Sequence, residues 1–242
     1  MLYLSRLMLN LRQRDTQFEL ADCNQLHGRI MSAFPVVPMG ISAREHFGVL
    51  YRLELLDDPT LARLLVQSNI SPDWSTLPAG YLASVSDGRD NPAVRSIEEE
   101  IGRVRPGMRL RFRLRANPTK RVSDRNSEQE VKWHGKRIEL RRPTDQIVWI
   151  ERKASDSGFR LLQVEVGDEV AIPDMRISDG PKQHGRRSSA GQRLSFGVAL
   201  FEGRLEVIDT ARFVETLCAG IGSAKAYGFG LLSIATLPGS AP

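Results

Sequence analysis

This 242-residue chain contains only two cysteines, Cys23 and Cys218, and no apolar run close to the roughly 20 residues that a membrane-spanning helix requires. Two cysteines suit a reducing compartment and are too few to form a zinc site without other ligands. His46, His134 and His184 show no metal-ligand spacing with one another or with carboxylates. These absences predict a soluble, cytoplasmic protein with no metal site, no cofactor and no membrane contact.

The net charge of +5 conceals an uneven distribution of charge along the chain. Residues 103–142 hold 14 Lys and Arg against 4 Asp and Glu, a net of +10, so the rest of the chain has a net of −5. A strongly basic segment in an otherwise acidic chain indicates a local patch that binds a polyanion.

The first half of the chain predicts a βαββαβ order. The elements are strand 2–11, helix 22–34, strands 46–56 and 60–68, helix 93–103 and strand 107–116. Asp22 is a plausible N-cap of the first helix, and Phe34-Pro35 ends it because a residue before proline avoids the α region. Residues 71–92, rich in Ser, Pro, Gly and Asp, suggest a long surface connection.

The second half repeats this pattern less regularly. Its elements are strand 131–141, helix 143–154, strand 158–166, an irregular basic stretch at 173–193, strand 194–207, helix 209–219 and strand 227–236. We therefore predict an α+β fold of two tandem ferredoxin-like (RRM-like) units with antiparallel sheets. The predicted domains are residues 1–120 and 121–242.

The strand at 107–116 alternates apolar residues with arginines. Arg109, Arg111, Arg113 and Arg115 share one face, because side chains alternate between the two faces of a strand. A row of like charges needs carboxylate partners or a bound anion. Nucleic acid is the favoured partner, since residues 116–121 continue the basic character, and an ordinary ion-paired surface is the alternative.

Residues 181–193 form a second basic segment that contains no acidic residue. Between two strands, such a segment would be a projecting loop or ribbon whose arginines reach phosphates or base edges. A disordered loop remains the alternative from composition alone.

His27 lies at the edge of the apolar stripe of helix 22–34. A lone helical histidine is usually structural, but proton transfer is its natural role at neutral pH, because its reference pKa is about 6.5. Cys23 lies on the same helical side, and a Cys–His nucleophilic pair would lack an orienting group and an oxyanion site.

A glycine-rich turn at residues 220–230 joins a predicted helix to a predicted strand. The order helix, turn, strand is the reverse of a Walker loop or a dinucleotide-binding turn, so neither motif fits. The glycines allow positive φ and close approach of a ligand, whereas a helix C-cap followed by a bulged strand is the structural alternative. The glycines in question are Gly220, Gly222, Gly228 and Gly230.

Three segments taken together resemble a known family. They are the helix with Leu26-His27 and Phe34-Pro35, the run Arg-Leu-Arg-Ala-Asn-Pro-Thr-Lys at 113–120, and the glycine-rich run at 220–232. In this order they resemble the CasE-type endoribonuclease that processes CRISPR transcripts in type I-E (Cascade) systems. The likeness covers nearly the whole chain and includes residues 146–153 and 201–203.

The resemblance implies a tandem ferredoxin-like fold and metal-independent cleavage of a CRISPR repeat stem-loop RNA. The ribose 2′-hydroxyl attacks the scissile phosphate, which gives 2′,3′-cyclic phosphate and 5′-hydroxyl ends. His27 matches the family's catalytic histidine, and the four glycines would let the RNA backbone approach. The resemblance also implies retention of the product RNA, assembly with the other subunits of the interference complex and a monomeric free protein. The expected RNA contacts are Arg29, Arg113, Arg115, Lys120, Lys182, Arg186, Arg187, Arg193 and Lys225.

The chain departs from the family pattern at one position near the catalytic histidine. Family members often carry a tyrosine three residues before that histidine, and this chain has Asn24. An amide can position a phosphate or hydroxyl by hydrogen bonding but cannot act as an acid or base. Proton transfer therefore rests on His27 alone or uses a group from elsewhere in the chain.

Two other functions compete with the nuclease. One is a binding protein that holds structured RNA without cutting it, as a scaffold in a ribonucleoprotein. The other is a DNA-binding regulator, which is disfavoured because the sequence has no helix-turn-helix or zinc module.

Overall fold

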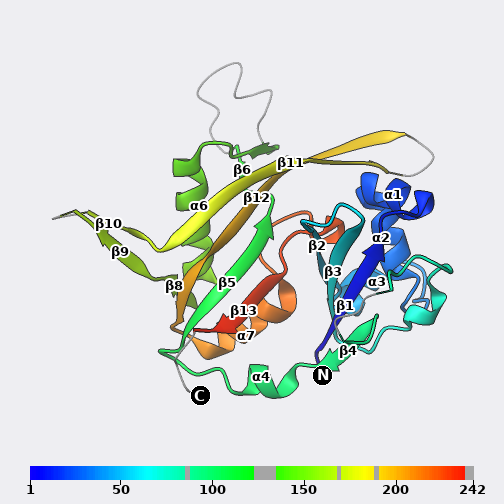
Figure 1. The fold of residues 1–242 in the computed structure, drawn as a ribbon. Coiled ribbons are helices and arrows are strands. Elements are labelled where there is room, and N and C mark those ends of the chain that lie inside the picture. The colour runs from blue at the N-terminus through cyan, green and yellow to red at the C-terminus, as the bar shows by residue number, and fades with distance from the viewer. Residues whose placement is uncertain (85–87, 123–134, 168–169, 188–190, 238–242) are drawn as a thin grey trace.

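The computed structural model describes residues 1–84, 88–122, 135–167, 170–187 and 191–237. Two main antiparallel sheets lie side by side, each with its own hydrophobic core (Figure 1). Within the described residues, no helix is both long and apolar enough to cross a membrane.

The N-terminal sheet has the strand order β2-β3-β1-β4. Its strands are β1 (Tyr3–Asn10), β2 (Leu50–Leu55), β3 (Leu61–Ser68) and β4 (Ala93–Ser96). The accompanying helices are α1 (Arg14–Ala21), α2 (Cys23–Met31), α3 (Ala43–His46) and the short 3₁₀ turn η1 (Trp74–Thr76). Leu26 and Ile30 of α2 are buried in the core of this sheet, as their helical spacing predicts.

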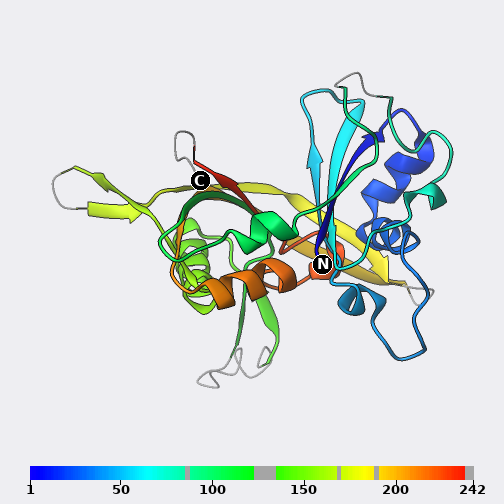
Figure 2. The same cartoon turned by 90° about the horizontal axis from the view of Figure 1, so that it is seen from below.

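The C-terminal sheet has the order β11-β12-β5-β13, with β8 also paired to β12. Its strands are β5 (Arg109–Ala116), β8 (Phe159–Leu161), β11 (Met175–Arg187), β12 (Gln192–Val207) and β13 (Leu232–Thr236). Helices α6 (Pro143–Asp156) and α7 (Thr210–Ala219) cover one face of this sheet (Figure 2). Trp149 of α6 and Phe213 of α7 share the core with Phe112 of β5.

Five smaller elements complete the described C-terminal half, and α4 (Glu98–Gly102) connects the two sheets. The five are the strand pair β6 (Thr119–Arg121) and β7 (Arg137–Glu139), the strand pair β9 (Gln163–Val166) and β10 (Val170–Pro173), and the short 3₁₀ turn η2 (Lys225–Tyr227), which precedes β13. Figure 1 shows the β9–β10 hairpin projecting away from the N-terminal sheet.

Both main sheets confirm the tandem ferredoxin-like prediction. In each, the strands lie in the order second, third, first, fourth, which is the arrangement that a βαββαβ unit produces. In the first unit, η1 is the one helical element among the described residues between β3 and β4, where a βαββαβ unit has its second helix.

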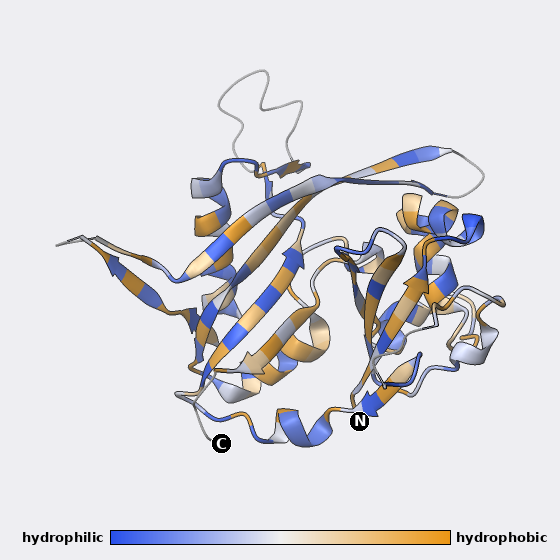
Figure 3. Ribbon diagram, in the orientation of Figure 1, coloured by the Kyte–Doolittle hydropathy of each residue, from blue (hydrophilic) through white to orange (hydrophobic). Residues whose placement is uncertain are grey.

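Strand β5 corrects the predicted division of the chain. The sequence prediction made residues 107–116 the last strand of the first unit, but β5 pairs with β12 and β13 and is the first strand of the second unit. Its apolar face requires a helical cover, and α6 and α7 provide that cover (Figure 3 shows the alternation along the strand). The fourth strand of the first unit is instead β4, where a helix was predicted. The two sheets therefore separate between residues 96 and 109, not at residue 120.

Several predicted bounds also change. The basic stretch 173–193 is not irregular, because β11 occupies most of it, and predicted strand 158–166 is two strands, β8 and β9. Predicted strand 227–236 begins only at Leu232, after η2. The prediction of a strand at 131–141 falls partly outside the described residues, and β7 lies in its C-terminal part. Helix α1 was not predicted, and residues 71–92 bury Trp74 and Tyr81 instead of running wholly over the surface.

Candidate functional site

Helix α2 presents His27 toward the C-terminal unit. Asp22 caps this helix as predicted, and its carboxylate accepts hydrogen bonds from the backbone N–H groups of Asn24 at 2.8 Å and Gln25 at 3.3 Å. His27 is half-buried at the edge of the apolar face. Its ring meets the ring of Tyr227 edge-on, with 6.2 Å between the ring centroids. The two domains therefore meet at the histidine.

The surroundings of His27 favour its neutral form. Burial of the ring, followed by the nearby positive charge of Arg44, lowers the pKa of His27 below its ordinary value of 6.5. Its Nδ1 atom is buried and has no hydrogen-bond partner among the described residues. A neutral imidazole at pH 7 can accept a proton, which is the requirement for a general base.

The glycine-rich turn packs tightly on the protein itself. Its four glycines, Gly220, Gly222, Gly228 and Gly230, all adopt positive φ. A Cβ atom on Gly228 would lie 2.8 Å from the ring of Tyr51, and one on Gly222 would lie 3.1 Å from the ring of Trp149. These contacts give internal reasons for glycine, so the predicted approach of the RNA backbone remains a prediction.

The buried Tyr51 and the half-buried Arg115 hold this turn in place. The Tyr51 hydroxyl donates a hydrogen bond to the carbonyl of Ala226 at 3.1 Å. Arg115 donates to the carbonyl of Gly228 at 3.0 Å and lies over the ring of Phe229, 4.4 Å from its centroid. Burial lowers the pKa of Arg115 to about 10, so the group stays charged at neutral pH. Arg115 thus has a structural role, and its RNA contact remains a prediction.

Three other predicted RNA contacts have carboxylate partners within the protein. Arg29 makes a bidentate pair with Glu19, at 3.0 and 2.6 Å. Arg113 bonds Glu202 at 2.6 Å and Glu54 at 3.0 Å. The partner of Lys182 is Glu139 at 3.1 Å. These contacts reduce the positive charge that each group offers to RNA.

The strands β11 and β12 extend past the sheet as a two-stranded ribbon that reaches α1 and α2 (Figure 1). Its arginines Arg186, Arg187 and Arg193 are exposed and make no ion pair with any described residue. Arg186 lies opposite Arg193 in the ladder, an arrangement that is unfavourable without a bound anion. A ribbon, one of the two forms considered for this segment, is confirmed.

The ribbon is attached to the start of the histidine helix. The backbone N–H of Arg186 donates to the Asp22 carboxylate at 3.1 Å. A Cβ atom on Gly185 would lie 2.6 Å from Sγ of Cys23, so only glycine allows this contact. The same carboxylate therefore caps α2 and holds the ribbon.

Lys225 and Lys120 remain available as cations. Lys225, in η2, is half-buried, and burial followed by the charges of Arg44 and Lys153 lowers its pKa. Lys120 in β6 is exposed. Neither makes an ion pair within the described part of the chain. Two lysines without a described carboxylate partner are suited to binding a phosphate.

A thiol nucleophile is not supported. Burial, followed by the charge of Asp22, raises the pKa of Cys23 to about 11, so the thiol is protonated at neutral pH. Among the residues that the structure describes, no three His, Cys, Asp or Glu side chains are grouped so that they could hold a metal ion.

The sequence analysis missed two residues beside His27, namely Tyr227 and Arg44. The ring of Tyr227 also stacks on Phe196, with centroids 5.1 Å apart. Its position two residues after Lys225 in the glycine-rich segment was a usable signal. Arg44 lies on the short helix α3, and no sequence pattern connects it with His27.

Comparisons with known proteins match the whole chain. The profile of the family described as CRISPR associated protein covers residues 2–236. The Thermus thermophilus CRISPR-associated endoribonuclease Cse3 is 37% identical over 235 residues, which cover 97% of this chain and 100% of that protein. The Escherichia coli CRISPR system Cascade subunit CasE is 29% identical over 219 residues, covering 89% of this chain and 93% of that protein.

A solved structure agrees with the sequence match. Thermus thermophilus Cse3 bound to an RNA representing a pre-cleavage complex aligns with a TM-score of 0.73 and 34% identity, over 97% of this chain and 98% of that chain. Because sequence and fold agree over the full length, this chain belongs to the CRISPR-associated family of Cse3/CasE-type endoribonucleases.

Proposed function

We propose that this chain cleaves CRISPR precursor RNA at its repeat stem-loops by attack of an internal 2′-hydroxyl, without a metal ion. The products carry 2′,3′-cyclic phosphate and 5′-hydroxyl ends. Membership of the Cse3/CasE family supports RNA processing, and the relative bound to an RNA that represents a pre-cleavage complex supports RNA binding by this fold.

The main observation behind the proposal is that His27, whose surroundings favour the neutral form, lies between the basic ribbon and the glycine-rich turn. His27 is half-buried, its pKa is lowered by burial, and its helix is attached to the ribbon through Asp22. An RNA stem bound along the ribbon arginines would place a phosphate at its base near His27.

The chemistry needs a base, a proton donor and positive charge. His27 takes the proton of the 2′-hydroxyl, whose oxygen attacks phosphorus as the bond to the 5′-oxygen breaks. That leaving oxygen gains a proton and becomes the 5′-hydroxyl. Lys225 lies in the turn that contacts α2 and stabilises negative charge on the phosphate.

Tyr227 is our candidate for the second polar group. Its ring contacts His27, and its hydroxyl forms no hydrogen bond with any described residue. A phenol can donate a hydrogen bond to a phosphate oxygen or to the leaving oxygen, and it can also act as an acid. The amide of Asn24 can donate a hydrogen bond but cannot act as an acid. The group therefore comes from the C-terminal unit, not from α2.

The product RNA stays bound, and the protein joins a multisubunit interference complex in the cytoplasm as a monomer. A relative is named as a Cascade subunit, which supports the assembly. The ribbon arginines have no carboxylate partners among the described residues, which supports tight RNA binding after cleavage.

An end-labelled CRISPR repeat hairpin from the source genome, incubated with the protein in EDTA, tests the reaction. A matched RNA carries 2′-deoxyribose at the cleavage nucleotide. We expect the first RNA to be cut and the second to remain intact, because only the first contains the nucleophile. Cutting of the deoxyribose RNA, or a requirement for added metal, would contradict the proposal.

The second candidate is an RNA scaffold that binds the hairpin without cutting it. The replacement of tyrosine by Asn24 favours it, because the usual phenol is missing from α2. Tight binding with no cleavage in the same experiment would select this function.

A further inference from the structure

A cleft lies beside the glycine-rich turn. Its walls come from the β6–β7 pair, from the C-terminal turns of α6 and from residues 220–225. The volume of the cleft is about 690 Å³. Lys225 lines it, and Tyr227, from the same 3₁₀ turn, contacts His27. The 3₁₀ turn η2 therefore contributes one residue to the cleft and another to the candidate active site.

Six of the fourteen described residues that line the cleft are cations. Asp156 is the only carboxylate among these described lining residues. The cations are Lys120, Arg121, Arg137, Arg152, Lys153 and Lys225. Only Lys153 has a carboxylate partner among the described residues, namely Asp156 at 3.6 Å.

The β6–β7 ladder adds a second, independent observation. Arg121 lies directly opposite Arg137 in this antiparallel pair. Like charges in opposed positions destabilise a ladder unless an anion lies between or beside them. The strand pair therefore places two guanidinium groups together at the rim of a cleft that already contains excess positive charge.

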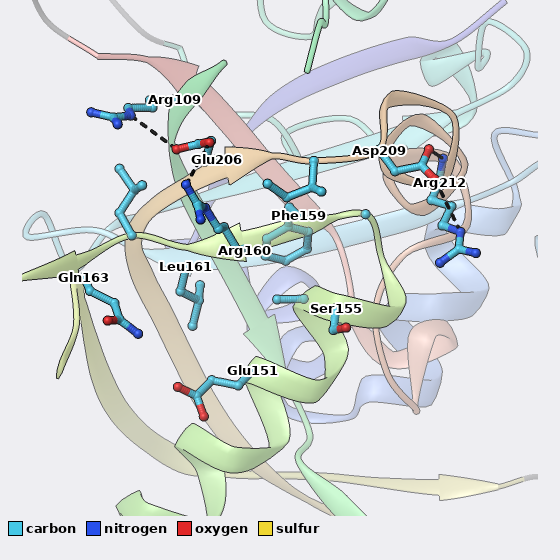
Figure 4. Close-up of a pocket in the computed structure, with 14 residues that line it drawn as sticks. Arg109, Glu151, Ser155, Phe159, Arg160, Leu161, Gln163, Glu206, Asp209 and Arg212 are labelled. Atoms are coloured by element: carbon cyan, nitrogen blue, oxygen red, sulfur yellow. Dashed lines mark hydrogen bonds and ion pairs between the residues drawn. The ribbon is translucent and has the colours of Figure 1, made fainter. Parts of the chain in front are cut away.

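Another hollow of the same protein contains arginines that are matched by carboxylates. This hollow, of about 800 Å³, lies between α6, β8 and the start of α7 (Figure 4). There Arg109 and Arg160 share Glu206, and Arg212 pairs with Asp209. Every arginine in that hollow has a carboxylate partner, so a hollow of this size in the same protein does not by itself carry a positive excess.

We infer that the cleft binds the phosphate backbone of a short single-stranded RNA segment, the one that continues from the stem-loop across the scissile phosphate. This rests on the proposed function. A hollow within the range of about 300–1,000 Å³ that small-ligand pockets occupy admits a few linked nucleotides but not a turn of duplex. The strand reaches the cleft across Lys225, directly from the site beside His27.

The cleft recognises phosphates rather than bases. Trp149 is the only aromatic residue among the described residues that line the cleft, and with 3% of its surface exposed it stacks on Phe201 inside the core. Because the described lining offers no accessible aromatic ring for base stacking, we expect binding with little sequence preference. The segment is therefore held by charge, and its affinity depends strongly on salt.

Three RNAs test this inference by equilibrium binding. One is the stem-loop alone, the second extends it across the cleavage nucleotide, which carries 2′-deoxyribose, and the third is extended at the opposite end. We expect the second to bind more tightly than the other two. Replacement of three cations together (Lys120→Ala, Arg137→Ala and Arg152→Ala) should remove that gain and lower the log–log salt slope by about 2, at about 0.7 per phosphate contact on a single strand.

The matched control is the double variant Arg160→Ala and Arg212→Ala in the hollow of Figure 4, which should bind all three RNAs like the wild type. Equal thermal melts verify that the variants are folded. Equal weakening of the stem-loop alone by the triple variant would overturn the inference, and so would an equal gain from the opposite extension or no gain at all. Cleavage of the extended RNA with its 2′-hydroxyl restored reports separately on the proposed function.

Discussion

Strand β5 and the basic cleft both concentrate cations, but they use them in opposite ways. On β5, Arg109 pairs with Glu206, and Arg113 pairs with both Glu202 and Glu54. Among the described residues that line the cleft, there is one carboxylate and there are six cations. The comparison teaches that a basic segment offers a polyanion only the charge that remains after internal ion pairs are formed.

The largest effect should come from His27, which belongs to neither group of cations. His27→Ala removes the proposed base, so we expect cleavage of the repeat hairpin to slow by about 10²–10⁴-fold. Hairpin affinity should stay near the wild-type value, because binding depends on ribbon and cleft cations. Single-turnover cleavage and filter binding measure the two quantities, and an unchanged rate would remove His27 from the mechanism.

Breaking the paired region should cost stability instead of RNA affinity. Glu54 has 12% of its side chain exposed and bonds Arg52, which is 3% exposed, together with Arg63 and Arg113. Burial by itself would raise the pKa of Glu54, but the three guanidinium groups outweigh it and hold that pKa below its usual value.

Glu54→Gln leaves a buried guanidinium without its counter-ion, so the free energy of unfolding should fall by about 3 kcal/mol. Urea unfolding measures this loss. Glu99→Gln, which removes the exposed partner of Arg103, is the control and should change stability by less than about 0.5 kcal/mol. A reduced salt slope for RNA binding in Glu54→Gln, with stability intact, would contradict a structural role for the β5 network.

The hydroxyl of Tyr227 should contribute to rate and little to binding. Tyr227→Phe keeps the ring that stacks on Phe196 and removes only the hydroxyl. We expect about a tenfold slower cleavage, the effect of one lost hydrogen bond to a charged group. Tyr3→Phe serves as control, because the hydroxyl of this half-buried residue of β1 donates only to Sδ of Met1, at 3.3 Å, among the described residues. If Tyr227→Phe cleaves at the wild-type rate while Tyr227→Ala is slow, the residue acts through its ring.

The same Arg→Gln substitution, made once in each region, isolates the effect of internal ion pairs on RNA binding. Arg152→Gln in the cleft should lower the log–log salt slope for the extended RNA by about 0.7, and Arg113→Gln on β5 should leave it unchanged. Both substitutions remove one guanidinium, so net charge is matched. Salt titrations of RNA binding measure the slopes, and equal changes would show that the internal ion pairs do not withdraw Arg113 from RNA.

The smallest effect should appear in the pH dependence. Because the pKa of His27 is lowered, its base form persists below pH 6.5, and the rate should fall by less than twofold between pH 8 and pH 6.5. Hairpin affinity should stay constant over this range, since the arginines of both regions remain charged. A half-maximal rate above pH 6.5 would mean that another group controls the reaction.

The alternation of β5 was predicted correctly, but the role of its arginines was not evident from the sequence. Glu54 and Glu202 lie 59 and 89 residues away from Arg113 and reach it only after β2 and β12 are placed beside β5. The same folding moved β5 from the first unit to the second. Tandem βαββαβ patterns fix the order of elements, whereas long-range pairing decides to which sheet a strand in the middle of the chain belongs.

The candidate site shows the same limit. The position of His27 on the edge of an amphipathic helix, the cap at Asp22 and the glycine-rich turn are local properties, and they were found from the sequence. Tyr227 and Arg44 were missed because their relation to His27 depends on the packing of η2 and α3 against α2.

The sequence by itself determined the family, the tandem α+β architecture and the histidine helix, because these depend on motifs and periodicity within short segments. Only the tertiary structure decided which cations are neutralised, which cleft cations lack a carboxylate partner among the described residues, and which ring lies beside His27. The physical reason is that electrostatic pairing and burial act between residues distant in the chain, over distances of a few ångströms that exist only after folding.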